Sequence, residues 1–398
     1  MSKTFTASAL ALLLAATASA QSVLVVAPVA GAGVFSTDIQ PAIDAAVDGD
    51  LVLVEAGTYS GFTIDAKGVS VVADGGAVVS NGRVTVKNVS ASTRVLLQGL
   101  TVHGDDLAPA IVTLNAPGAI WIESCTVTGS TSTTGPGLVA VSINSCPSVV
   151  IERSLMTGGD ATTGGPVNMG GPALHVANSG VAVGDSQCLG GIGAATSSAG
   201  GGFGGSGLRV LSGFVFASGS SFQGGAGAAP VPPQFPGGVG GAGINTEAPV
   251  TLLECTVAGG PGFPASPPTV VSGAGSVAVL PGVARHFSIG SPVREGQMTT
   301  ITAGGVPGET AWLLFSPSPS PPLLLLPFKG ALVLPATAPM FALGLIPASG
   351  TLSTPIVMPN LPPALQSTTV WCQSIFAAPA THAMIGPASA LVILDAAL

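Results

Sequence analysis

The chain has 398 residues, only 7% of them charged, and it contains 57 glycines and 34 prolines. A bundle of helices laced by i,i+4 ion pairs needs more charges and fewer helix breakers, so the composition predicts an all-β, turn-rich protein. The net charge is −8, and the ten lysines and arginines are scattered singly. No basic stripe for a phosphate backbone is present, so we expect no nucleic-acid partner.

The first 20 residues have the pattern of an export signal. Lys3 precedes an apolar run over residues 9–16, and Ala18-Ser19-Ala20 follows with the small residues that a signal peptidase accepts. The apolar run is shorter than the roughly 20 residues of a membrane-spanning helix. We therefore predict a signal peptide over residues 1–20, a secreted or cell-surface protein, and no transmembrane helix after cleavage.

A short helix is expected next, followed by the first strand. Ser36-Thr37-Asp38 offers N-cap side chains and Pro41 suits a first helical turn. Apolar residues recur at helical spacing at Ile39, Ala42, Ile43, Ala46 and Val47. The run DGDLVLVEAGTY (48–59) then reads as a strand between two turns, so we expect the helix to cap one end of a stack that begins there.

A repeat that ends in glycine follows. The closing glycines are 25, 29, 32, 34 and 35 residues apart, at Gly104, Gly129, Gly158, Gly190, Gly224 and Gly259. Residues two before them are mostly apolar: Val102, Val127, Met156, Cys188, Phe222 and Val257. Residues four before them are Leu100, Cys125, Ser154, Ser186, Ser220 and Cys255. Alternate residues of a strand share a face, so both columns should point inward and the polar residues between them outward.

These repeats predict a β-solenoid. A second strand precedes most of them, at residues 111–115, 138–144, 173–178 and 207–212. Several strands per repeat fit coils stacked about 4.8 Å apart. The growing period comes from Gly-rich insertions directly after the closing glycine, which we expect to lengthen loops at one corner. Their GxGxxG patterns lead into strands and do not indicate a dinucleotide site.

The helix at 36–47 leading into Gly49-Asp50, an apolar run and Gly57-Thr58-Tyr59 resembles right-handed parallel β-helix proteins of the pectin-lyase-like group. The resemblance covers roughly residues 36 to 262 and implies an all-β fold with an N-terminal cap over residues 21–262. It implies little about activity, because this architecture serves many functions.

The pattern changes after residue 262. We predict a Pro-rich linker over 263–272 and a small β-sandwich-like domain over 273–398, where short β-like runs alternate with Pro and Gly turns. The stretch PNLPPALQSTTVWCQ and the final PASALVILD resemble a C-terminal module of exported proteins from planctomycete-type bacteria. That resemblance implies export and no substrate.

The candidate chemistry is sparse. Polygalacturonase-like relatives would show Asn-Thr-Asp, Asp-Asp, Gly-His-Gly and Arg-Ile-Lys motifs, and only Asp105-Asp106 matches. Asp106 and Asp160 both lie two residues after a closing glycine, two coils apart, which places them roughly 10 Å from each other. His103 and Asp105 would lie beside them. The same aspartates can instead simply cap turns, as Asp does beside Gly.

A Ca²⁺ ion held by Asp105, Asp106 and Asp160 is a further alternative, although few oxygen ligands are visible. Trp121 is expected to be buried and not to serve as a sugar platform. Cys125, Cys188 and Cys255 fall in the inward columns, and Cys146 and Cys372 have no evident partners. We therefore expect free thiols and no disulfide framework.

Two functions remain open. The first is an exported, non-catalytic scaffold that contacts polysaccharide or envelope material through its polar β-face and Gly-rich loops. The second is a polysaccharide lyase or glycoside hydrolase acting through Asp106 and Asp160, with Asp105 and His103 beside them. The shortage of outward carboxylates and basic residues favours the first.

Overall fold

The computed structural model describes residues 21–79, 82–131, 135–162, 169–196, 200–229, 237–263, 268–325, 328–377 and 383–398. The predicted signal peptide, residues 1–20, lies outside them. Within the described ranges, no helix is both long and apolar enough to cross a membrane.

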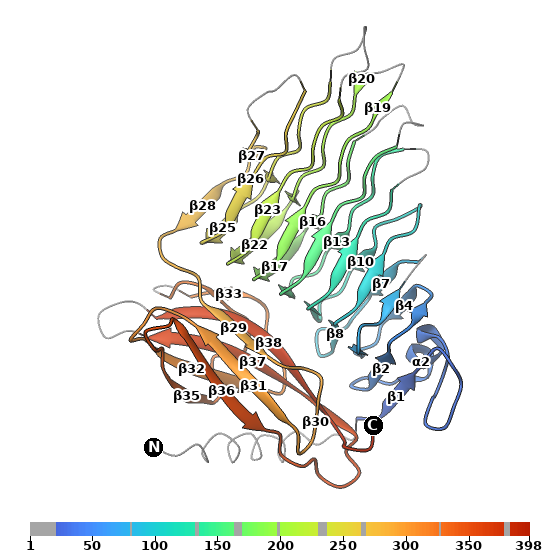
Figure 1. The fold of residues 1–398 in the computed structure, drawn as a ribbon, viewed down its shortest axis with the longest axis vertical. Coiled ribbons are helices and arrows are strands. Elements are labelled where there is room, and N and C mark those ends of the chain that lie inside the picture. The colour runs from blue at the N-terminus through green and yellow to red at the C-terminus, as the bar shows by residue number, and fades with distance from the viewer. Residues whose placement is uncertain are drawn as a thin grey trace.

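The first part of the chain is a parallel β-helix in which each full coil gives one strand to each of three sheets (Figure 1). Sheet 1 contains β1 (Val23–Val26), β2 (Leu51–Glu55), β5 (Ser70–Asp74), β8 (Arg94–Gln98), β11 (Ala119–Glu123), β14 (Val149–Glu152), β17 (Ser179–Gly184), β22 (Gly213–Ser218), β25 (Val250–Leu253) and β28 (Val277–Leu280). Sheet 2 contains β3 (Thr58–Tyr59), β6 (Val78–Val79), β9 (Thr101–His103), β12 (Thr126–Thr128), β15 (Leu155–Thr157), β18 (Gln187–Leu189), β23 (Ser221–Gln223) and β26 (Thr256–Ala258). Sheet 3 contains β4 (Phe62–Asp65), β7 (Val84–Lys87), β10 (Ile111–Leu114), β13 (Val141–Asn144), β16 (Leu174–Ala177), β21 (Leu208–Val210), β24 (Ile244–Thr246) and β27 (Val271–Ser272).

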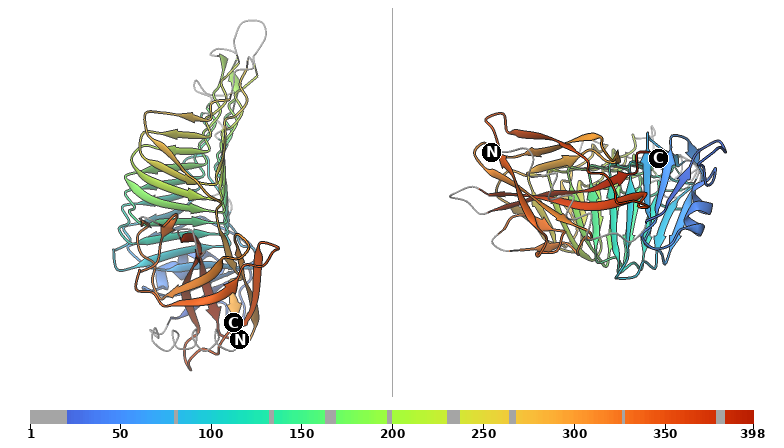
Figure 2. Two further views of the ribbon diagram at one scale, coloured as in Figure 1. Left: turned by 90° about the vertical axis from the view of Figure 1, so that its left-hand side faces the viewer. Right: turned by 90° about the horizontal axis from the view of Figure 1, so that it is seen from below.

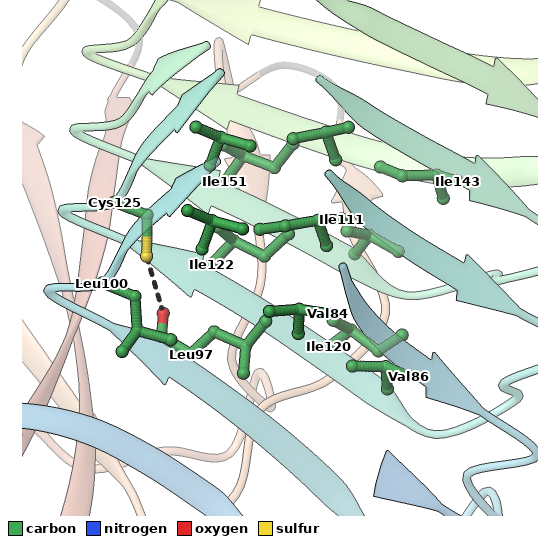
Figure 3. Packing of buried hydrophobic residues seen from close by; sticks show 14 of the residues in the cluster. Val84, Val86, Leu97, Leu100, Ile111, Ile120, Ile122, Cys125, Ile143 and Ile151 are labelled. Carbon is green, nitrogen blue, oxygen red and sulfur yellow. Dashed lines mark hydrogen bonds between the residues drawn. The ribbon is translucent and has the colours of Figure 1, made fainter. Parts of the chain in front are cut away.

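The predicted interior ladders are confirmed. Val127 pairs in register with Val102 and Met156, and Cys188 pairs with Phe222. All five of these side chains are buried. Figure 3 shows the same stacking in the neighbouring sheets, where Leu97, Ile122 and Ile151 lie one above another. Apolar side chains repeated once per coil therefore build one continuous core.

A buried column of hydroxyls runs through the same interior. The Ser186 Oγ accepts a hydrogen bond from the Ser154 N–H at 3.0 Å and donates to the Gly184 carbonyl at 2.7 Å. Ser154 and Ser220 repeat this arrangement in the adjacent coils. Each buried hydroxyl is thus satisfied by backbone, which is why small polar residues are tolerated in an inward column.

Left-handed residues turn the chain at two corners of each coil. Asn88, Asn115, Ser145 and Asn178, with φ between +49° and +57°, connect sheet 3 to sheet 1. At the corner between sheets 1 and 2 the equivalent positions are Gly99, Ser124, Arg153, Asp185, Gly219 and Glu254. Asn and Gly adopt this conformation at low cost, so these corners follow from the sequence.

The N-terminal end is capped, with two differences from the expectation. Helix α2 (Ile39–Ala45) begins after Asp38, whose carboxylate accepts from the Ile39 N–H at 2.9 Å, and it buries Ile39, Ala42 and Ile43. Val47 lies past the helix end and is 64% exposed, so its place in the apolar stripe was wrong. Strand β1 precedes the helix and pairs with β2, so the stack begins before residue 48.

Two sheets form the C-terminal part. One contains β29 (His286–Ile289), β31 (Met298–Gly304) and β36 (Thr351–Val357), and the other contains β30 (Val293–Arg294), β38 (Met384–Leu394), β37 (Ser367–Ala377), β32 (Thr310–Ser316) and β35 (Met340–Leu345). Side chains from both sheets, such as Phe287 and Leu391, share one buried cluster, as in a β-sandwich. Strands β33 (Leu323–Leu324) and β34 (Ala331–Leu332) form a separate hairpin.

The solenoid extends past the boundary expected from the sequence. Strand β27 pairs with β24 and β28 pairs with β25, so coil strands continue to Leu280. The run SVAVL, assigned to the second domain, therefore belongs to sheet 1, and residues 271–272 of the expected linker belong to sheet 3. The aligned closing glycines end at Gly259, so the repeat gave no marker for the strands that follow it.

The five-stranded sheet packs with its second face on the outer face of sheet 1. Trp121 of β11 and Trp371 of β37 meet with ring centroids 4.6 Å apart, and both are fully buried. Strand β38 lies between two apolar layers, so all of its residues are buried. Burial on both faces explains its continuous apolar sequence, without two-residue alternation.

Opposite sheet 1, the Gly-rich insertions project as a narrow extension (Figure 2, left). Within its described residues, β19 (Ala195–Thr196) and β20 (Gly200–Gly201) pair antiparallel. Glycine backbones of outgoing and returning segments bond to each other from coil to coil. Seven glycines form a chain of hydrogen bonds in which the N–H of each donates to the carbonyl of the previous one, at 2.8 to 2.9 Å. In order, they are Gly159, Gly171, Gly191, Gly205, Gly225, Gly241 and Gly260. We call this region the glycine slab.

Candidate functional site

The four predicted site residues lie at the end of sheet 2 and just beyond it. His103 ends β9 with an exposed side chain. The Asp105 carboxylate accepts from the N–H groups of Leu107 and Ala108 at 3.1 and 3.0 Å, which is a turn-capping role. The Asp106 carboxylate accepts from the Ser130 hydroxyl at 2.8 Å. Asp160 accepts from the Ile192 N–H at 2.7 Å.

Strands β9, β12 and β15 pair in register, with His103 opposite Thr128 and Thr126 opposite Leu155. Asp106 and Asp160 each lie three residues after their strand, but the chain turns back toward sheet 3 at Asp106 and continues outward into the glycine slab at Asp160. Their separation of roughly 10 Å stays a prediction from the repeat. Each carboxylate already accepts a bond from a neighbouring coil or its own turn. Among the described residues, no group of three His, Cys, Asp or Glu side chains is placed to hold a metal ion, so Asp105, Asp106 and Asp160 form no such group.

The outer face of sheet 2 is polar and open. His103, Thr126, Gln187, Gln223 and Thr256 are exposed, each on a different strand of the sheet. The side chains alternate with the buried ladder as the sequence predicts. Hydroxyl and amide groups therefore stand along this face at the coil spacing, interrupted by Leu155 and Leu189, and no sheet 2 strand from β9 to β26 carries a carboxylate.

Sheet 1 carries a carboxylate pair that the sequence did not predict. Glu123 of β11 and Glu152 of β14 are neighbours across the ladder, and both point outward beneath the C-terminal sheets. Glu123 accepts from the Trp121 indole N–H at 3.0 Å, the Ser389 hydroxyl at 2.6 Å and the Ala390 N–H at 2.7 Å. It is also paired with Arg153.

The Arg153 guanidinium ties the two parts of the chain together. It donates to the Phe287 carbonyl at 2.9 Å and to the Ser389 hydroxyl at 2.8 Å, as well as to Glu123. Its left-handed backbone, with φ of +48°, places it at the corner next to sheet 1. One cation thus lies beside two buried carboxylates, and of the two it donates a hydrogen bond to Glu123 alone.

Glu152 is the unbalanced member of this group. Its Oε1 accepts from the Ala388 N–H at 3.3 Å, and its Oε2 is buried without a partner. Burial raises the pKa of this carboxyl well above its usual value, and Arg153 opposes the shift without cancelling it. A cavity of about 10 Å³ beside it, lined also by Ser218 and Gln373, has about the volume of one water molecule. The pair is therefore a structural acid cluster enclosed by protein.

The two glutamates occupy equivalent positions in the repeat, but the repeat alone assigns them to the wrong face of the sheet. Both glutamates lie six residues before a closing glycine, in IESCTVTG and IERSLMTG. Alternation counted back from the glycine would place them inward, with Cys125 and Ser154. The left-handed corner residues Ser124 and Arg153 reset the alternation, so the glutamates face outward.

The five cysteines are free, as predicted, and four of them are buried. Burial raises the pKa of the Cys125 thiol to about 12 and shifts Cys188 in the same direction. Trp121 is buried as expected, beneath the C-terminal sheets.

The comparisons with known proteins concern the fold alone. No protein-family model matches the chain, and no curated protein matches it. Among solved structures it is similar to the crystal structure of pectate lyase Pel9A, with a TM-score of 0.36 and 12% sequence identity over 66% of this chain and 79% of that chain. The fold assignment rests on the three parallel sheets described above.

Proposed function

We propose that this protein is an exported, non-catalytic β-helix scaffold, secreted or held at the cell surface, that contacts polysaccharide or other envelope material. The observation that carries the proposal is the open face of sheet 2, where uncharged hydroxyl, amide and imidazole side chains are exposed on β9, β12, β18, β23 and β26. Such groups donate and accept hydrogen bonds, as sugar hydroxyls require. The signal-like residues 1–20 and the C-terminal resemblance to modules of exported proteins support export.

The face opposite to the glycine slab is not available for this role. The C-terminal sheets cover the outer side of sheet 1, including the adjacent carboxylates Glu123 and Glu152. A polymer would therefore lie along sheet 2, beside the projecting slab. The slab offers few charges, since Asp160 is its sole ionisable residue between 157 and 173.

The alternative function is a polysaccharide lyase or glycoside hydrolase acting through Asp106 and Asp160. It is favoured only by the two-coil spacing of these exposed carboxylates, which is just beyond the roughly 6.5–9.5 Å of inverting glycosidases. Asp105 and His103 would assist in that case. In the structure Asp105 caps its own turn, and Asp106 and Asp160 accept bonds from neighbouring coils.

A glycan screen separates the two functions. The protein without residues 1–20 is tested against neutral and anionic polysaccharides for binding and for release of unsaturated or reducing ends. We expect binding without release, unchanged by Asp106→Asn and Asp160→Asn and weakened by the double change Gln187→Ala, Gln223→Ala. Catalysis lost in the two aspartate variants would establish the alternative, and no binding to any polymer would refute the scaffold role.

A further inference from the structure

A second pocket lies where a corner of the solenoid meets the C-terminal domain. It has a volume of about 190 Å³ and is lined by the turn at residues 91–94, by Pro117, Ala119 and Ser148, and by the loop at Ser318, Pro319 and Pro321. No carboxylate lines it. The volume is below the roughly 300–1,000 Å³ of sites for drug-sized ligands, so the pocket suits a small one.

Among the described residues, Arg94 is the only charged side chain in the pocket wall. Its side chain is partly buried, and among the described residues its guanidinium has neither an ion pair nor a hydrogen bond. Burial lowers the pKa of this guanidinium, and no carboxylate opposes the shift. The arginines at or within the C-terminal part, Arg153, Arg285 and Arg294, are each paired with a carboxylate. A partly desolvated cation with five unused donors is costly unless an anion completes it.

Ser148 adds a second unsatisfied group. The register of sheet 1 places Arg94 opposite Ala119, and Ser148 precedes Val149 in the next strand, on the same outward face. The small Ala119 side chain between them leaves the hollow. The Ser148 Oγ is buried and has no hydrogen-bond partner, which is uncommon for a native hydroxyl.

We propose that this pocket binds a small oxyanion, either a carboxylate or a sulfate, through the Arg94 guanidinium. The planar fork of Arg matches two oxygens of such a group, and the Ser148 hydroxyl, turned by a χ1 rotation, supplies a further donor. The site is separate from the open face of sheet 2 and does not depend on polysaccharide contact there.

The test measures binding of sulfate, acetate and glucuronate by calorimetry and by thermal shift, at constant ionic strength set with chloride and with glucose as neutral control. We expect saturable binding of the anions and none of glucose. Arg94→Gln should weaken binding about 10- to 100-fold, the loss expected for charge-assisted hydrogen bonds. Arg83→Gln, at an exposed arginine, is the matched control and should bind as the parent does.

Tighter binding of glucuronate than of acetate and sulfate assigns the site to a sugar acid, whereas strongest binding of sulfate assigns it to a free inorganic oxyanion. Ala119→Leu, which fills the pocket and keeps the charge, should also abolish binding. The proposal is overturned if the parent shows no saturable binding, or if Arg94→Gln and Ala119→Leu bind as Arg83→Gln does. Because only small anions are used, this outcome is independent of the polysaccharide screen.

Discussion

The two ends of each coil are held in opposite ways. At sheet 1 large side chains meet the C-terminal sheets, and Trp121, Leu96 and Phe216 are all buried there. In the glycine slab the contacts are between backbones, because a Cβ added at Gly159, Gly191 or Gly225 would overlap a carbonyl oxygen of the neighbouring segment. The same repeat is therefore closely packed in two ways: by large side chains at sheet 1, and by direct backbone contact, without side chains, in the glycine slab.

The comparison predicts that removing atoms harms the sheet 1 end most. Trp121→Ala should lower the free energy of unfolding by about 3–5 kcal/mol, since it leaves a cavity against Trp371. Chemical denaturation monitored by circular dichroism measures the loss. Trp312→Ala, at a partly exposed tryptophan of β32, is the control and should cost clearly less. Equal losses would show that the interface is not tightly packed.

At the slab, adding a single methyl group should be harmful. Gly191→Ala is expected to cost about 1–3 kcal/mol, because the new Cβ meets the Gly159 carbonyl and the backbones must separate. Hydrogen exchange should show faster exchange at Gly191 and Gly205. Gly31→Ala, where no atom lies within 4 Å of the added Cβ, should change stability little. A slab that tolerates Gly191→Ala as well as Gly31→Ala would contradict the backbone-packing account.

The buried carboxylate at the sheet 1 end gives a pH-dependent prediction. The pKa of Glu152 is raised in the folded state, so above the ordinary glutamate value of 4.5 the unfolded chain releases a proton that the folded chain keeps. Stability should therefore fall as pH rises from about 4.5 toward the folded pKa. Glu152→Gln removes this loss and should be more stable than the parent at pH 7 and similar near pH 4.

Thermal unfolding between pH 4 and pH 8 tests this, with Glu55→Gln as control at an exposed glutamate. Parallel pH profiles for Glu152→Gln and the parent would mean that Glu152 is not held neutral. The slab has no counterpart to this buried carboxylate among its hydrogen-bonded glycines.

The smallest effect is expected at the edge of the interface. His286 Nδ1 lies 2.8 Å from the Asp185 carboxylate, and this bond raises the pKa of the imidazole. The contribution of this bond to stability is fully present below the pKa of a histidine in the unfolded chain, about 6.5. It is lost as the pH rises through the higher pKa of His286 in the folded protein. His286→Ala should reduce stability at pH 5.5 slightly and not at pH 9. His103→Ala, at an exposed histidine of sheet 2, is the control variant.

The interior of the solenoid could be predicted from the sequence, and its outer contacts could not. The glycine-aligned columns at Val127 and Met156 follow from alternation within one strand, and the structure confirms them. Glu123 and Glu152 were missed because a left-handed residue stands between them and the aligned strand. Docking of β38 on sheet 1 depends on contacts between residues more than 200 positions apart, which no local pattern encodes.

The candidate site shows the same division. The repeat register predicted that Asp106 and Asp160 lie two coils apart. It could not predict that these carboxylates accept hydrogen bonds from the Ser130 hydroxyl and the Ile192 N–H. Arg94 gave no signal, because its lack of a partner depends on what the folded chain places around it.

The glycine slab has one more consequence. In four successive coils, one residue follows the pair of glycines that leads from sheet 2 into the slab, and it takes an equivalent position at the slab surface. These four residues differ widely in chemistry: Asp160, Ile192, Ala226 and Pro261. Since the glycines alone fix the spacing of the layers, the identity of these outer groups is uncoupled from folding. Selection can therefore rewrite the chemistry of this rim without rebuilding the molecule beneath it.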